Sequence, residues 1–252
     1  TNKGPMKTRA FVNCAGVYGG VLHNMISTRP VRIIPRRGQY YLLDRDEHLP
    51  FGMTLFQVPT KMGKGVLISP TTHGNLLIGP TAEDIEDGGD TVTTGLGLSD
   101  VLSKAALTWP DINIRSVITN FSGVRAHEVG GDFIIGAVEG AADGAFEAIG
   151  IESPGLPAAP AIGEELGIWV AYSLQLPKKR YLREPPPMPK AFSHMSPQER
   201  EAAYQQDPEY GRIVCRCETV TEAEVRQAIR QPVGARTLDG VKRRTRAGMG
   251  RC

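Results

Sequence analysis

Three of the four cysteines of this chain are grouped near its end, at Cys215, Cys217 and Cys252. A pair separated by one residue and followed much later by a third does not match the short C-x₂₋₄-C pairs that are typical of zinc fingers. Residues 1–16 contain no continuous apolar segment of the secretory-signal kind, so we expect a reducing compartment, where disulfides are rare. The grouping therefore favours ligation of a metal or a cluster over disulfide bonds. The remaining cysteine, Cys14, is expected to be a small buried core residue.

The segment that carries the grouped cysteines is basic. Residues 209–252 contain ten Lys/Arg and five Asp/Glu, which leaves nineteen of the 29 Lys/Arg and twenty-two of the 27 Asp/Glu for residues 1–208. A basic tail can indicate nucleic-acid binding, but no aromatic interleaving or nucleic-acid motif accompanies it, so we expect no nucleic-acid partner. A basic surface for a partner, or compensation for an anionic cofactor, fits the charge better. Thr221 and Glu224 stand at capping-box spacing and predict the start of a helix.

Short segments rich in strand-forming residues recur through the first half of the chain. RIIPRRGQYYLLD is followed by TLFQVP, GVLISP and NLLIGP, and Pro or Gly closes each of these three. This rhythm predicts an antiparallel sheet. Apolar residues at helical spacing before Pro110 predict a helix over 98–106, after which the pattern returns to strand. A second helix is expected after Ser153, with Ser153 as its N-cap. Between 176 and 208 proline and polar residues dominate, and we expect a linker or wrapping arm there.

The spacing and surroundings of the cysteines resemble the BFD-like [2Fe-2S] domain, a small helical unit attached to some flavoenzymes. IVCRCETVTEAEVRQAI is similar to its first ligand pair and following helix, and GARTLDGVKRRTRAGMGRC to the segment that delivers the third ligand. The resemblance implies that Cys215, Cys217 and Cys252 are cluster ligands. In that family a fourth cysteine follows shortly after the third, and this sequence stops before it, so we expect the chain to hold the cluster poorly. Three unrelated free cysteines and a zinc site are the alternatives.

A second resemblance covers roughly residues 8–175. The blocks FVNCAG, IIPRRGQYYLLD, PTTHGNLLIGPTAED, FSGVRA, DFIIG and IESPGLPAAPAIGEEL are similar, in order and spacing, to those of DAO-type FAD-dependent oxidoreductases, above all glycerol-3-phosphate dehydrogenase-like and L-2-hydroxyglutarate oxidase-like members. It implies an α+β fold, in which an antiparallel substrate-binding sheet and part of a Rossmann-like FAD domain (1–175) are followed by a linker (176–208) and a small helical [2Fe-2S] domain (209–252). The family's G-x-G-x-x-G turn is not in this sequence, so we expect the C-terminal portion of such a protein, without the adenine side of the FAD site.

The second resemblance also implies which residues contact FAD. Backbone N–H groups at the start of the helix in SPGLPAAP would face the pyrimidine edge of the flavin and stabilise negative charge on reduction. The NCAG turn would lie near the dinucleotide. The implied cofactor-binding residues are Ala15, Gly16, Pro154, Gly155, Leu156 and Pro157.

For the substrate, the family resemblance points to Arg125 in SGVRA, because a guanidinium can bind a carboxylate or phosphate through two hydrogen bonds. A structural ion pair is the alternative for this arginine. His73 in TTHGN is a candidate base for a substrate hydroxyl, and a turn histidine bound to neighbouring backbone is the alternative.

Gln39 and Tyr41 belong to the block that lines the substrate cavity in the family. Side chains alternate along a strand, so the sequence leaves open which of the two points inward. Arg36 and Arg37 are expected to face solvent or to steer a phosphate rather than to take part in catalysis.

The expected function is oxidation of a small anionic hydroxy (or amine) substrate by FAD, with electrons passing to the [2Fe-2S] cluster and on to an acceptor such as a quinone or a carrier protein. Glycerol 3-phosphate is the first expected substrate, a 2-hydroxy acid the second and an amine or amino acid the third. The alternatives are a non-catalytic electron-transfer or scaffold subunit completed by a partner chain, and a basic interaction module with a degenerate site. We expect the chain alone to be inactive and the protein to be cytoplasmic, with the membrane surface or a partner subunit as a further contact.

Overall fold

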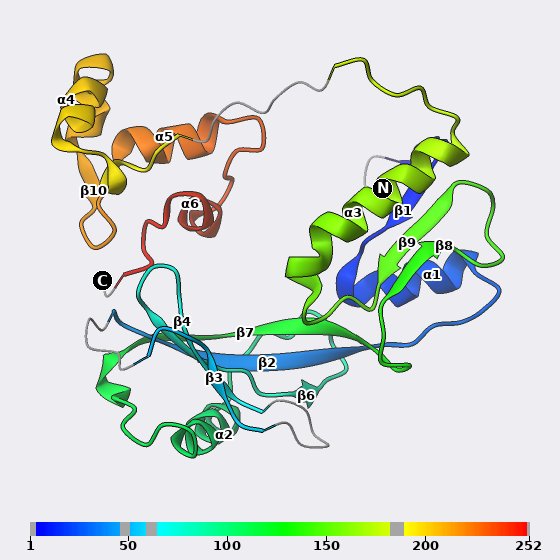
Figure 1. The fold of residues 1–252 in the computed structure, drawn as a ribbon, viewed down its shortest axis with the longest axis horizontal. Coiled ribbons are helices and arrows are strands. Elements are labelled where there is room, and N and C mark those ends of the chain that lie inside the picture. Colours follow the sequence, from blue (N-terminus) through cyan, green and yellow to red (C-terminus); the bar gives the residue numbers. More distant parts are fainter. Residues whose placement is uncertain (1–3, 46–50, 59–64, 182–188, 251–252) are drawn as a thin grey trace. The chain divides into compact units, whose positions relative to one another are not determined.

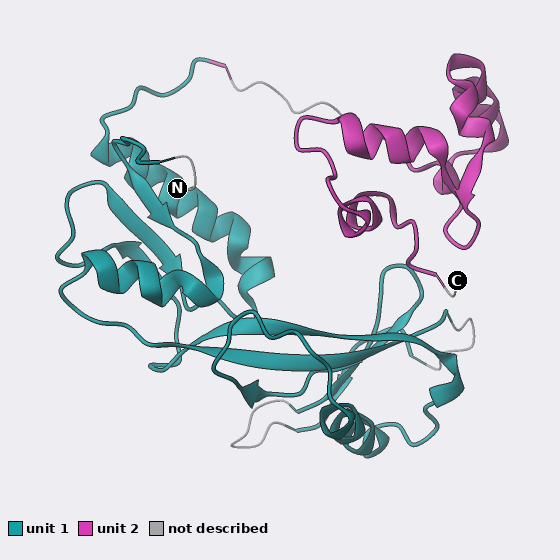
Figure 2. Ribbon diagram, turned by 180° about the vertical axis from the view of Figure 1, so that it is seen from behind, with its two compact units in different colours: residues 1–180 teal, residues 181–252 magenta. Residues whose placement is uncertain are grey.

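The computed structural model describes residues 4–45, 51–58, 65–181 and 189–250. The chain folds into two compact units, Thr1–Arg180 and Tyr181–Cys252, which Figure 2 colours teal and magenta. Within the described ranges, no helix is both long and apolar enough to cross a bilayer.

A large antiparallel sheet occupies the first unit (Figure 1). One edge of its central strand β2 pairs with β5 and β6, while the other edge pairs with β7 along its whole length. The pairing continues from β5 to β4 and from β4 to β3, as the Pro- and Gly-closed segments predict. The strands are β2 (Ile33–Leu43), β3 (Leu55–Phe56), β4 (Leu67–Pro70), β5 (Leu76–Gly79), β6 (Glu83–Asp84) and β7 (Val117–Glu128), which the short helix η2 (Ile114–Ser116) precedes.

Helix α2 (Gly95–Ala106) covers one face of this sheet, with Val101 and Ala105 fully buried in the main core. It begins three residues before the predicted helix because the side chain of Thr94 accepts a hydrogen bond from the N–H of Gly97, at 3.1 Å, and caps the first turn. The sheet contributes the rest of this core from alternating positions: Leu43, Val66, Ile68, Leu76 and Ile78.

A second, three-stranded sheet in the order β1-β9-β8 forms the other layer of the first unit. Strand β1 (Phe11–Asn13) runs parallel to β9 (Ala145–Ile149), and β8 (Ile134–Ala137) is antiparallel to β9. Helix α3 (Gly155–Ser173) packs on one face of β9, and α1 (Gly19–Ile26), preceded by the short helix η1 (Gly16–Tyr18), reaches the opposite face. A parallel strand pair with helices on both faces is the expected part of a Rossmann-like domain, and with the antiparallel sheet it confirms the α+β class.

A buried ion pair ties α1 to β9. Nδ1 of His23 lies 2.8 Å and 2.9 Å from the two carboxylate oxygens of Glu147, and Nε2 lies 2.7 Å from the carbonyl oxygen of Arg29. Since a carboxylate and a carbonyl only accept, both ring nitrogens donate and the ring is an imidazolium. Burial lowers the pKa of His23, but the hydrogen bonds to Glu147 and to the Arg29 carbonyl together outweigh this effect. The pKa of His23 is therefore raised.

The second unit consists of short elements around a small core. They are η3 (Phe192–His194), α4 (Pro197–Gln206), η4 (Pro208–Gly211), β10 (Ile213–Cys215), β11 (Val220–Thr221), α5 (Glu222–Arg230) and α6 (Leu238–Thr245). The capping box predicted for Thr221 and Glu224 is confirmed at the start of α5.

Part of the segment expected to be a linker, 176–208, is ordered structure of the second unit. The Phe192 ring stacks on Tyr210 with ring centroids 6.0 Å apart, and the N–H of Phe192 donates to the carboxylate of Glu224 at 2.9 Å. Helix α4 carries its own capping box, formed by Ser196 and Glu199. The compact units accordingly divide between residues 180 and 181, whereas the sequence predicts boundaries at 175 and 208.

Candidate active site

The two faces of the β2–β7 ladder differ because side chains alternate along each strand and directly opposed residues share a face. One face carries Gln39 and Leu43 and packs against α2. The side chains on the opposite face do not belong to the core under α2. In register, it pairs Arg36 with Arg125 and Tyr40 with Phe121, with a pair of glycines between them. We call this the β2–β7 face: Arg36, Gly38, Tyr40, Phe121, Gly123, Arg125 and His127.

Two arginines stand directly opposite one another on the β2–β7 face, an arrangement that is unfavourable unless anions compensate it. Arg36 is compensated by Asp84, to which its Nε and one terminal nitrogen donate at 2.6 Å and 3.1 Å. These hydrogen bonds hold the pKa of Asp84 below its ordinary value, with smaller contributions in the same direction from His127 and Arg125.

Arg125 keeps hydrogen-bonding capacity that the fold does not use. One terminal nitrogen donates to the carbonyl oxygen of Thr81 at 3.0 Å. Its Nε is buried and has no hydrogen-bond partner in the described part of the chain, where no carboxylate pairs with it either. A buried donor on a charged group favours an external acceptor strongly, so the site is suited to a phosphate or carboxylate.

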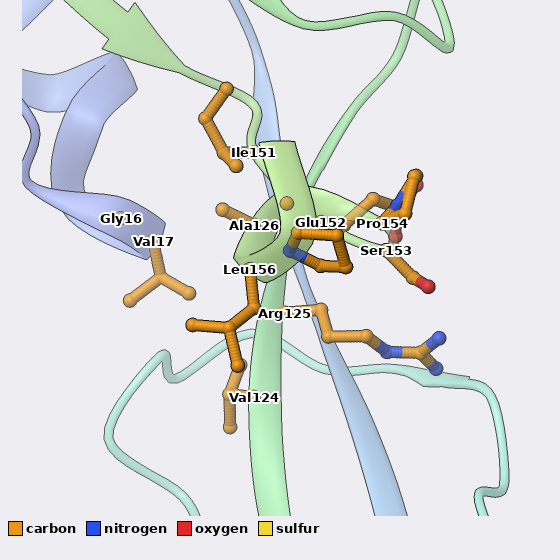
Figure 3. Close-up of a pocket in the computed structure, with 12 residues that line it drawn as sticks. Gly16, Val17, Val124, Arg125, Ala126, Ile151, Glu152, Ser153, Pro154 and Leu156 are labelled. Atoms are coloured by element: carbon orange, nitrogen blue, oxygen red, sulfur yellow. The ribbon is translucent and has the colours of Figure 1, made fainter. Parts of the chain in front are cut away.

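A cavity of about 370 Å³ lies where β7, η1 and the start of α3 meet. Figure 3 shows the Arg125 side chain extending away from Val124 toward the side of Ser153. The lining combines five of the six residues predicted to bind the cofactor with the arginine predicted to bind the substrate. It consists of Gly16, Val17, Val124, Arg125, Ala126, Ile151, Glu152, Ser153, Pro154, Gly155, Leu156 and Pro157.

The start of α3 is electropositive. Its N-cap is Pro154, without any side-chain cap, and its first turn holds no acidic residue. The expected Ser153 cap is therefore wrong. The N–H of Gly155 donates to the carbonyl oxygen of Glu152 at 2.5 Å, and that of Leu156 has no backbone partner in the described residues. A 19-residue helix directs its positive end at the cavity from this point, which suits an edge of a ligand that gains negative charge.

Two glycines leave room for a flat ligand. A side chain at Gly16, which has a φ of +57°, or at Gly123 would point into space with no atom within 4 Å. Gly123 lies between Phe121 and Arg125 on the β2–β7 face, so the missing side chain creates a hollow beside the arginine. The uncapped helix start and the open space at Gly16 fit the isoalloxazine side of the FAD that the sequence resemblance implies, whereas the hollow at Gly123 lies on the face of Arg125.

The structure distributes the other predicted site residues differently. Gln39 is fully buried, and its side chain accepts from the N–H of Thr94 at 2.7 Å, so it supports the start of α2. Tyr41 packs into the core on the same side. His73 is exposed in the turn between β4 and β5, beyond the point where Leu43 pairs with Leu76.

The distance from that turn to the cavity follows from the register. Arg125 pairs with Arg36, seven positions along β2 from Leu43, which amounts to about 23 Å at the usual rise of a strand. His73 therefore lies at the other end of the sheet from the cavity. Ala15 is half-buried next to Gly16 and outside the lining, and Cys14 is exposed, so the prediction of a buried core cysteine is wrong.

Three functional candidates were not predicted from the sequence. Tyr40 rather than Tyr41 shares the face with Arg125; burial raises the pKa of its phenol and the charge of Arg125 opposes the rise. His127 Nδ1 lies 2.8 Å from Oε1 of Glu152, a lining residue. The two-residue spacing of Arg125 and His127 is a signal for a shared face that the sequence contains.

The second unit brings two of the predicted ligands together. Cys215 is buried at the end of β10 and Cys217 is exposed in the following turn. The N–H of Gly248 donates to Sγ of Cys215 at 3.4 Å, and a side chain at Gly250 would stand 2.3 Å from Cβ of Cys217. Close glycine backbone and an N–H aimed at sulfur fit thiolates that hold an iron–sulfur cluster.

Cys252, the third predicted ligand, lies outside the described residues. Among the residues that are described, no three His, Cys, Asp or Glu side chains form a group that could hold a metal ion.

Comparison with known proteins finds a family match for each of the two parts of the chain. Residues 1–169 match the FAD dependent oxidoreductase (DAO) family, and residues 213–252 match the BFD-like [2Fe-2S] binding domain. The cofactors of the two matched domains are FAD and a [2Fe-2S] cluster.

Three relatives are informative. A glycerol 3-phosphate dehydrogenase from Caloramator mitchellensis is 45% identical over 258 residues, covering 100% of this chain and 52% of that protein. A glycerol 3-phosphate oxidase from Mycoplasma pneumoniae is 35% identical over 162 residues, covering 63% of this chain and 42% of its own length. A solved structure of the L-alpha-glycerophosphate oxidase from Mycoplasma pneumoniae with FAD bound has a TM-score of 0.58 at 31% identity, covering 64% of this chain and 42% of that one.

The chain thus spans about half the length of the curated relatives it matches. The family match extends over most of the first unit, including both sheets and the cavity. The chain belongs to the FAD dependent oxidoreductase family.

Proposed function

We propose that this chain is the substrate side of a flavin-dependent dehydrogenase that oxidises glycerol 3-phosphate and passes electrons to a [2Fe-2S] cluster in its second unit. The observation that carries the proposal is the Arg36–Arg125 pair on the β2–β7 face, in which Arg125 retains a buried, unpartnered Nε beside the cavity. The dehydrogenase from Caloramator mitchellensis, which matches over the whole chain, supports glycerol 3-phosphate as the substrate.

The anionic group of the substrate binds Arg125. Its Nε and a terminal nitrogen form the planar fork that suits two oxygens of one phosphate or carboxylate. Arg36 adds positive charge from the opposite strand, while its fork is held by Asp84 and so stays in a fixed orientation. The hollow at Gly123 leaves space for the carbon skeleton next to the arginine.

FAD, when bound, supplies the hydride acceptor for the carbon that carries the hydroxyl. On this chain, Gly16, Gly155, Leu156 and Pro157 would hold the flavin against the start of α3. The positive end of that helix would stabilise the negative charge that the ring gains on reduction, and Val17 and Leu156 give the cavity an apolar wall.

Electrons leave through the second unit. Cys215, Cys217 and Cys252 would ligate the cluster, and the terminal acceptor would be a quinone or a carrier protein. A quinone acceptor would bring the protein to the membrane surface as a peripheral protein.

The proposal is tested by anaerobic reduction of the flavin in the purified, FAD-loaded holoenzyme that contains this chain, because the chain alone is expected to be inactive. Glycerol 3-phosphate is expected to remove the absorbance of oxidised flavin faster than an L-2-hydroxy acid or an amino acid does. An Arg125→Gln variant should bind glycerol 3-phosphate about 10- to 100-fold more weakly, because it loses hydrogen bonds between charged groups. Arg115→Lys, at an exposed position in η2, is the matched control and should behave as wild type.

Two results would count against the proposal. If a 2-hydroxy acid reduces the flavin and glycerol 3-phosphate does not, the proposed substrate is wrong, but the proposed dehydrogenase reaction stands. A flavin that no small anionic hydroxy compound or amine reduces would exclude the dehydrogenase and leave an electron-transfer subunit.

A further inference from the structure

A histidine–carboxylate pair lies next to the cavity and has no role in the core. Nδ1 of His127 lies 2.8 Å from Oε1 of Glu152, with exposed side-chain fractions of 20% and 24%. A carboxylate at this distance accepts, so Nδ1 carries a proton, and when the ring is neutral Nε2 presents its lone pair. In the described part of the chain, no hydrogen bond reaches Nε2.

The pair is positioned relative to the anion site by regular strand geometry. His127 follows Arg125 by two residues in β7, so both side chains project from the β2–β7 face about 7 Å apart. Glu152 lines the cavity together with Arg125, and it also lines a second cavity of about 280 Å³ on its other side. A three-carbon substrate whose anionic group is bound by Arg125 extends over a similar length.

Charges on every neighbouring element surround the imidazole. Arg36 on β2 and Arg125 on β7 are positive, while Asp84 on β6 and Glu152 before α3 are negative. The effect of His127 on Asp84, and of Glu152 on Arg36, shows that these groups form one electrostatic cluster. The two positive and the two negative neighbours balance one another in charge.

We propose that His127 is the general base for the substrate hydroxyl and that Glu152 is the residue that positions it. This rests on the proposed function. The O–H proton of the substrate moves to Nε2 of His127, the hydride of the adjacent C–H bond goes to the oxidised flavin, and the carbinol becomes a ketone. The imidazolium that results keeps its Nδ1 hydrogen bond to Glu152 and later releases the proton to solvent.

The main test is His127→Gln in the FAD-loaded holoenzyme that contains this chain, since the glutamine amide can still donate to Glu152 but cannot take up a proton. Anaerobic flavin reduction by glycerol 3-phosphate is measured across pH, with the dissociation constant as a second readout. We expect the rate to fall about 100- to 10,000-fold with an unchanged dissociation constant. The wild-type rate should rise with pH as the base loses its proton, and this rise should be absent from the variant. His194→Gln, an exposed histidine of the second unit, is the control.

A readout that does not depend on turnover comes from NMR of the protein labelled with ¹⁵N-histidine. His127 should show the Nδ1–H tautomer when the ring is neutral. Glu152→Gln should change the tautomer that is observed. The same Glu152→Gln variant should move the pH-dependent rise to lower pH, because the imidazolium loses a stabilising carboxylate. This variant decides the matter even when His127→Gln fails to fold.

The outcomes separate this inference from the function on which it rests. Wild-type rates and pH dependence in His127→Gln, or an unmoved pH dependence in Glu152→Gln, overturn the base assignment while the dehydrogenase proposal stands. An Nε2–H tautomer in the neutral ring also overturns it. A wild-type flavin that glycerol 3-phosphate and its analogues do not reduce overturns both proposals.

Discussion

Replacing His23 by leucine is expected to lower the free energy of unfolding of the β1-β9-β8 layer by about 3–5 kcal/mol, the usual range when one partner of a buried ion pair is removed. The magnitude follows from the burial of the pair: the side chains of His23 and Glu147 are only 4% and 2% exposed. The variant leaves the Glu147 carboxylate without its partner in an apolar layer, and it removes the donor to the Arg29 carbonyl as well. Replacing His23 and Glu147 together by leucine should recover most of the loss, because no charge is then left buried.

The stability of this layer should also depend on pH with a predictable sign. The pKa of His23 is raised above 6.5 in the folded protein, so the folded state holds its proton more tightly than the unfolded state does. The contribution is complete below about pH 6.5, provided that carboxylates are ionised, and is lost as pH rises through the raised folded-state value. The slope in that interval is at most about 1.4 kcal/mol per pH unit for one proton.

Urea-induced unfolding followed by tryptophan fluorescence measures these effects, because Trp169 packs against the same layer. The only other tryptophan, Trp109, belongs to the core under α2. To remove its fluorescence, the wild type and the variants are all measured in a Trp109→Phe background. A loss below 1 kcal/mol in His23→Leu, or a stability that rises with pH above 6.5, would refute the assignment of an ionised buried pair.

Three further predictions concern single positions. Gly123→Val should fill the hollow on the β2–β7 face and weaken glycerol 3-phosphate binding at unchanged flavin content, as measured by substrate titration; unchanged affinity would mean that the hollow is not the substrate position. Gly250→Ala should lower iron and acid-labile sulfide below the wild-type content, since its side chain would collide with Cys217, and a content equal to that of the wild type would contradict this. Thr221→Ala should cost about 0.5–2 kcal/mol by removing the cap that Thr221 forms with Glu224, measured as a lower unfolding midpoint of the second unit; an unchanged midpoint would contradict it.

Local sequence determined the features that depend on a few neighbouring residues. The capping box at Thr221 and Glu224 was predictable because both partners lie within one helical turn. The strands closed by Pro and Gly, the helix before Pro110 and the C-x-C pair are likewise local patterns. The order of the sequence blocks identified the family, and five of the six residues predicted from it to bind the cofactor line the cavity.

Tertiary structure alone decided which side chains meet in the site. The sequence predicts that side chains alternate along β2, but not which set of them faces the site, because that depends on which face α2 covers. In the structure, Tyr40 shares a face with Arg125 and Gln39 does not. The His127–Glu152 pair joins residues 25 positions apart across a sheet edge and a helix start. Such contacts depend on strand register and packing between distant segments, and neither leaves a local signal in the sequence.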